Sequence, residues 1–181
     1  MKIRALFFAT PLIPALWVST LAYSKEEQML KVATFNVSME ATNYKALGTK
    51  PSNKVLQHVL STGEHPQVKN IAEIIQRINP DILLLNEFDY IADKRKGVEA
   101  FIENYLNVSQ QGLEPVDYPY TYVAPVNTGE PTTFDLDNNG KAEGIGGDAY
   151  GFGLYPGQYG MALLSKYPID VDGIRTFQTF K

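Results

Sequence analysis

The sequence contains no cysteine, so it can build neither a disulfide framework nor a thiolate site. Histidine is also scarce, with His58 and His65 the only two in 181 residues. Charged residues make up 20% and hydrophobic residues 44% of the chain, a balance that predicts a packed core rather than disorder. The length suits one ordinary domain or part of a larger one.

The N-terminal segment has the pattern of a secretory signal peptide. Lys2 and Arg4 give a short basic start, residues 5–22 are mostly apolar, and residues 22–24 read Ala-Tyr-Ser, with small residues where a signal peptidase cleaves. We therefore expect residues 1–24 to be removed by cleavage after Ser24.

A retained membrane anchor is the alternative for this segment, but Pro11 and Pro14 would interrupt a spanning helix and the stretch is short for a bilayer. We expect residues 25–181 to be periplasmic or secreted, with no membrane span in the mature form. Loss of the two basic residues lowers the net charge from −4 to −6. Because an acidic protein gains little from counterion release on a nucleic acid backbone, nucleic acid is the less favoured partner.

Hydrophobic periodicity predicts strands interleaved with helices, which indicates a mixed α/β architecture. Residues 31–37 alternate in the strand period, and the Leu-rich run 82–85 is predicted to be a strand buried on both faces. From Pro66 to Ile78, apolar residues at helical spacing predict an amphipathic helix. The other predicted elements are helices at 53–60 and 98–105 and strands at 120–124, 161–165 and 174–180.

Residues 140–160 contain eight glycines, with Tyr150, Phe152, Tyr155 and Tyr159 among them. This composition predicts a long surface loop. It is either an insertion that covers a sheet edge or a substrate-facing loop with aromatic contacts.

Polar side chains stand at the ends of two predicted strands. Asn36 lies near the end of the first, and Glu87 follows the run 82–85 directly. If the strands are neighbours, an amide oxygen and a carboxylate could converge there, a donor set suited to Mg²⁺, Mn²⁺ or Ca²⁺. Taken singly, Asn36 could equally be a turn amide and Glu87 a solvated charge.

The segments "VATFNV" (32–37), "INPDILLLNEFD" (78–89) and "GQYGMALLSKYPI" (157–169) occur in this order. Together they resemble the endonuclease/exonuclease/phosphatase superfamily of metal-dependent phosphoesterases, most closely its exported bacterial members. The resemblance implies that Glu87 binds the catalytic Mg²⁺ or Mn²⁺ and that Asn36 helps orient metal or phosphate. It also implies a four-layer α/β sandwich and hydrolysis of a phosphoester, which the acidic charge suggests is small or lipid-like.

The chain departs from the family pattern, because Ser38 stands where some family nucleases carry Asp and the later catalytic His, Asp-x-Asn and Asp-His motifs are missing. His58 and His65 precede Glu87, in the wrong order for the family's acid or base, and we interpret both as surface residues. We therefore expect residues 25–181 to be the N-terminal part of such a domain, with an incomplete sandwich that is inactive alone.

A second ion site is suggested by Asp135, Asp137, Asn139 and Gly140, which match the start of a calcium loop. The twelfth position is Gly146 rather than the bidentate Glu, although Asp148 could substitute at a displaced spacing. The segment is thus either a polar turn without an ion or an extracellular Ca²⁺ site.

A secreted binding module on the same scaffold is the alternative to an enzyme. Such a module would use the loop at residues 140–160, together with calcium, to hold a ligand.

The signal peptide predicts a mature N-terminus at Lys25. Intact-mass measurement of protein recovered from the periplasm or medium should show loss of residues 1–24. A membrane-fixed species that still carries these residues would contradict the prediction.

Overall fold

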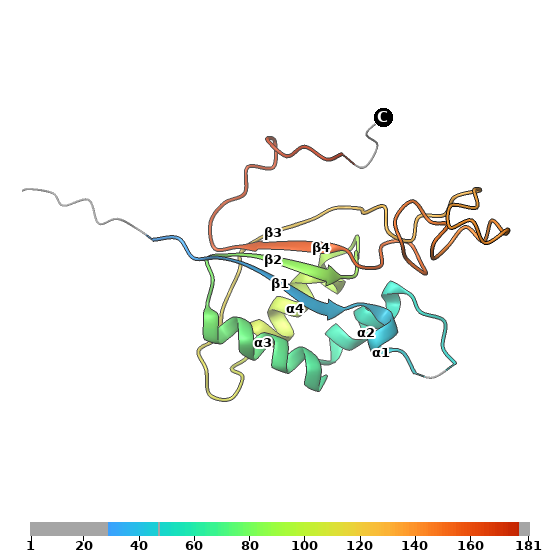
Figure 1. Ribbon diagram of the computed structural model, residues 1–181. Helices are drawn as coiled ribbons and strands as arrows, with labels where there is room; N and C mark the ends of the chain where they lie inside the picture. The colour runs from blue at the N-terminus through green and yellow to red at the C-terminus, as the bar shows by residue number, and fades with distance from the viewer. Residues whose placement is uncertain (1–28, 47, 178–181) are drawn as a thin grey trace, which may run out of the picture.

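The computed structural model describes residues 29–46 and 48–177, and the predicted signal peptide lies outside them. Four strands form one mixed sheet in the order β1-β2-β4-β3, and the helices lie along one side of it (Figure 1). Within the described ranges, no helix is long and apolar enough to cross a membrane. The elements are β1 (Val32–Met39), α1 (Ala41–Tyr44), α2 (Asn53–Thr62), α3 (Pro66–Ile78), β2 (Ile82–Phe88), η1 (Lys94–Lys96), α4 (Val98–Phe101), η2 (Ile102–Leu106), β3 (Tyr120–Val123) and β4 (Met161–Ser165).

The sheet begins with a parallel pair. β1 runs parallel to β2, with Val32 opposite Ile82, while β4 runs antiparallel to both β2 and β3. Because a parallel pair needs a crossover, the chain passes through α1, α2 and α3 between the two strands. The carboxyl ends of β1 and β2 therefore lie at the same edge of the sheet.

The predicted helices at 53–60 and 66–78 are confirmed as α2 and α3. Pro66 occupies the first turn of α3, where its missing N–H is not needed, and Asn79 ends the helix with φ 47° while its N–H bonds Ile75 O at 2.7 Å. Ile78 belongs to the apolar stripe of the predicted helix, but as the last residue of α3 it is 49% exposed.

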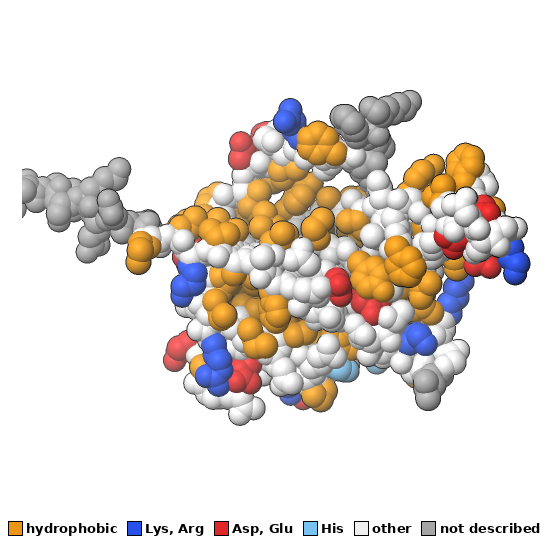
Figure 2. Space-filling view, viewed as in Figure 1, with side chains coloured by type: hydrophobic (Ala, Val, Ile, Leu, Met, Phe, Trp, Pro, Cys, Tyr) orange, Lys and Arg blue, Asp and Glu red, His pale blue; other side chains and the backbone are white. Residues whose placement is uncertain are grey.

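The core lies between the sheet and the helices, and it includes Leu83 and Leu85 of β2. Full burial of such a side chain contributes about 1.5–3 kcal/mol. The prediction that β2 is buried on both faces was wrong, since Ile82 and Leu84 on the opposite face are only half-buried. Hydrophobic side chains also gather over the strands on that side (Figure 2).

The described residues thus form two layers, one sheet and one set of helices. The α/β class is confirmed, and the four-layer sandwich stays a prediction. The strand predicted at 174–180 was wrong for its described part, since residues 174–177 are irregular. The β-propensity of Ile, Thr and Phe alone therefore does not suffice to form a strand.

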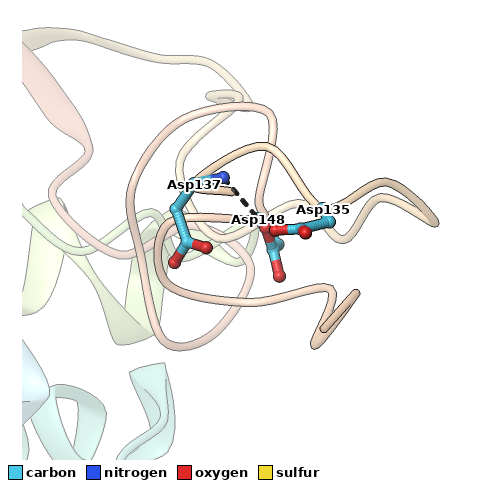
Figure 3. A group of neighbouring side chains, drawn as sticks. All are labelled: Asp135, Asp137 and Asp148. Atoms are coloured by element: carbon cyan, nitrogen blue, oxygen red, sulfur yellow. Dashed lines mark hydrogen bonds between the residues drawn. The ribbon is translucent and has the colours of Figure 1, made fainter. Parts of the chain in front are cut away.

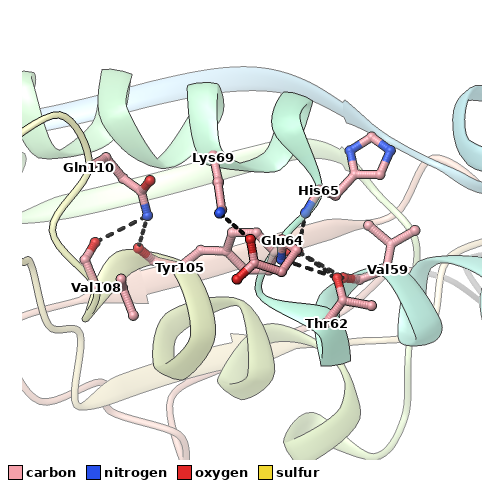
Figure 4. Close-up of polar contacts among 8 residues, drawn as sticks. All are labelled: Val59, Thr62, Glu64, His65, Lys69, Tyr105, Val108 and Gln110. Atoms are coloured by element: carbon pink, nitrogen blue, oxygen red, sulfur yellow. Dashed lines mark hydrogen bonds and ion pairs between the residues drawn. The ribbon is translucent and has the colours of Figure 1, made fainter.

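The helix predicted at 98–105 is confirmed as α4, which continues as the π-helix η2. Tyr105 of η2 is fully buried, and its hydroxyl donates to Val59 O at 2.8 Å. The same hydroxyl accepts from the N–H of His65 at 3.3 Å, so it joins η2 to the turn between α2 and α3 (Figure 4).

Removal of the Tyr105 hydroxyl should destabilise the protein, because Tyr105→Phe leaves the His65 amide without this acceptor. We expect the free energy of unfolding to fall by about 1–3 kcal/mol in urea titrations. The exposed Tyr120→Phe should change it by less than about 0.5 kcal/mol. Equal, small changes in both variants would contradict the role assigned to this hydroxyl.

Candidate functional site

The shared edge of β1 and β2 brings the predicted residues close together. Asn36 lies opposite Asn86 in the parallel register, and Glu87 is the next residue along β2. Asn36 is exposed, and its Oδ1 accepts from the N–H of Ser38 at 3.1 Å and from the Ser38 hydroxyl at 3.4 Å. Glu87 is half-buried.

A β-bulge interrupts the pair at this point. Asn36 faces Asn86 and Met39 faces Phe88, so two residues of β1 stand against Glu87 alone. Ser38 and Glu87 both adopt left-handed backbone conformations, with φ 49° and 55°. Such a conformation is uncommon for these residue types and persists only where the surrounding structure holds it.

The bulge decides which residue enters the core. In an unbroken strand Glu87 would continue the face of Leu83 and Leu85, and its carboxylate would be driven into the core. Instead Phe88 takes the buried position, at 1% exposure, and Glu87 stays half-buried at the edge. The strained turn therefore keeps a charged side chain accessible at the end of a core strand.

Two further carboxylates, Glu40 and Asp89, are buried at this edge with exposures of 2% and 0%. Asp89 Oδ2 accepts from the Ala41 N–H at 3.0 Å and from the Tyr155 hydroxyl at 2.6 Å. Its Oδ1 is buried with no hydrogen-bond partner in the described part of the chain. Burial raises the pKa of Asp89 to about 7, although the bonds from Tyr155 and Ala41 oppose the shift.

Glu40 caps the N-terminus of α1, where its carboxylate accepts from the Thr42 N–H at 2.9 Å. The Gln158 amide donates to the same oxygen at 2.8 Å. Neither Glu40 nor Asp89 forms an ion pair with a described basic side chain. Hydrogen bonds, rather than ion pairs with described basic side chains, therefore support the two buried groups.

Tyr159 lies near these charges and has φ 56°. Burial, followed by the charges of Glu40 and Glu87, raises the pKa of its phenol. Tyr159 also lines a cavity of about 530 Å³ over the sheet, together with Leu84 and Met161. The charged edge and this largely apolar cavity therefore meet at Tyr159.

A separate acidic group lies in the loop between β3 and β4. Asp135, Asp137 and Asp148 each offer a carboxylate oxygen within 4.8 Å of the others, and they converge from different parts of the loop (Figure 3). The pKa of Asp148 lies below its usual range, mainly because the backbone N–H of Glu143 donates to its carboxylate. Asn139 adjoins the group and donates from its side-chain amide to Asp137 at 3.0 Å.

The two histidines lie on the helical side of the chain. His58 is exposed on α2, as predicted. His65 is half-buried before α3, with its ring 4.8 Å from that of Tyr44 in an edge-on contact and its Nδ1 buried without a partner in the described structure. The interpretation of His65 as a surface residue was therefore wrong.

Sequence reasoning assigned no role to Glu40, Asp89 or Gln158, and it took Tyr155 only as a candidate substrate contact. Asp89 did carry a signal, because it is a second carboxylate two positions after Glu87. Glu40 and Gln158 carried none, since their contact joins residues 118 positions apart.

Comparison with known proteins identifies one family. A family model described as "Endonuclease/Exonuclease/phosphatase family" matches residues 33–181, most of the chain. No curated protein and no solved structure shows a significant match.

Proposed function

The chain belongs to the endonuclease/exonuclease/phosphatase family, and from this premise we propose that it serves in divalent-metal-dependent hydrolysis of a phosphoester. The observation that carries the proposal is the left-handed Glu87 at the bulge, which keeps a carboxylate at the edge shared with Asn36. Strained non-glycine residues of this kind concentrate at functional sites.

The residues at the edge fit a hard cation such as Mg²⁺ or Mn²⁺. Glu87 and Asn36 offer oxygen donors, which these ions prefer. The buried Oδ1 of Asp89 has no hydrogen-bond partner among the described residues, and neither Glu40 nor Asp89 forms an ion pair with them. When bound, the cation supplies Lewis-acid polarisation of a phosphoryl oxygen.

Two side chains of the edge have separate roles in this proposal. Glu87 anchors the cation through its carboxylate, and Asn36 orients metal or phosphate through its amide. The net charge of −4 favours a small or lipid-like phosphoester over a nucleic acid duplex as substrate.

We also propose that the loop holding Asp135, Asp137 and Asp148 binds Ca²⁺, with Asn139 beside it. The proximity of three carboxylate oxygens supports this, because a divalent cation between them would offset their mutual repulsion. Such a site would stabilise the loop, and it also suits the alternative function as a secreted calcium-dependent binding module.

Glu87→Gln keeps the side-chain shape but removes the charge that would hold the cation. In an Asp137→Ala background, which disables the loop site, we expect calorimetric Mn²⁺ affinity to fall by at least about tenfold. Hydrolysis of 4-nitrophenyl phosphate and bis(4-nitrophenyl) phosphate by the whole gene product should fall by orders of magnitude. The exposed Glu114→Gln is the matched control. Unchanged affinity, or full activity at saturating Mg²⁺, would show that Glu87 is not the ligand.

Calcium should protect the acidic loop from trypsin, which can cleave after the exposed Lys141. Cleavage at Lys141 should slow in millimolar Ca²⁺ relative to chelator, and Asp137→Ala should remove the difference. The exposed Asp172→Ala should retain it. Identical digestion of the wild type with and without calcium would leave only a polar turn.

A further inference from the structure

The Gly-rich loop (residues 140–160) contacts the sheet end that carries Asn36 and Glu87, which we call the metal edge. Two of its side chains bond to the buried carboxylates there. The Tyr155 hydroxyl donates to Asp89 Oδ2 at 2.6 Å and also accepts from the Ala41 N–H at 2.9 Å. The Gln158 amide donates to Glu40 Oε2 at 2.8 Å, while its own oxygen accepts from the Leu154 N–H at 2.7 Å. Each of the two side chains is therefore held by a second hydrogen bond as well as by its bond to a carboxylate.

The backbone of the loop also bonds directly to residues that follow Glu87. The N–H groups of Phe88 and Tyr90 bond to the carbonyls of Gly160 at 3.0 Å and Gly157 at 2.8 Å. The N–H of Asp89, between them, bonds to Met39 O of β1 at 3.0 Å. The three residues after Glu87 are thus held alternately by the loop and by β1.

This approach depends on glycine. A Cβ on Gly160 would lie 2.7 Å from Phe88 O, a distance that real Cβ atoms essentially never show. Gly157 has φ 85°, and a Cβ there would lie 3.1 Å from the Cβ of Tyr90. Glycine at these two positions therefore allows the loop to pack directly on the strand end.

A left-handed Glu87 needs such support, because the surrounding structure must over-determine a strained conformation for it to persist. We infer that Tyr155 and Gln158 are positioning residues of the metal edge, which hold the loop on Asp89 and Glu40 and so fix the turn that presents Glu87. This inference rests on the proposed function. The loop is then a structural part of the site, held against the end of the sheet, rather than an insertion that only covers a sheet edge.

The test measures Mn²⁺ affinity by calorimetry in the Asp137→Ala background, well below the melting temperature of each variant. Tyr155→Phe removes the donor to Asp89, and Gln158→Met removes the donor to Glu40 at similar length. We expect each to weaken Mn²⁺ binding by about tenfold, the lower end for loss of a partner that orients a ligand. Tyr150→Phe, 69% exposed in the same loop, should leave the affinity unchanged.

The outcomes separate this inference from the proposed function. If Glu87→Gln weakens Mn²⁺ binding while Tyr155→Phe and Gln158→Met only lower the melting temperature, the two residues merely stabilise the fold and the inference is wrong. If Glu87→Gln has no effect either, the proposed function itself fails. Failure of both loop variants to fold at any temperature would also contradict the inference, because the contacts would then hold the fold rather than the edge.

Discussion

Glu40 and Asp89, two carboxyl groups buried without a basic partner in the described ranges, set the main constraint on this molecule. Burial of an unpaired charge is costly, so Glu40 and Asp89 need several hydrogen bonds each. These come from the start of α1 and from Tyr155 and Gln158 of the Gly-rich loop. The need to satisfy them joins segments that are far apart in the sequence at one edge of the sheet.

The bulge between β1 and β2 converts that edge into a site. It breaks the alternation that would carry Glu87 into the core, and it places Phe88 there instead. The conformational strain at Glu87 is offset by the bonds that hold the residues after it to β1 and to the loop. The same contacts that satisfy the buried charges therefore keep an accessible carboxylate at a strand end.

Local pattern was enough to predict most of the helices and strands, because periodicity reports which face packs on the core. It also placed Asn36 and Glu87 at strand ends, but the parallel pairing that brings these ends together comes from the structure. It could not reveal Glu40 or Gln158, whose roles arise from a contact across 118 positions. It also overestimated burial of Leu84, because a Leu-rich run does not show whether a second layer covers its other face.

The central claim is that this edge holds the cation through Glu87. The most direct measurement is anomalous diffraction from crystals of the protein grown with Mn²⁺. The account predicts a peak within coordination distance of a carboxylate oxygen of Glu87 and beside Asn36. A peak confined to Asp135, Asp137 and Asp148, with none at Glu87, would contradict it.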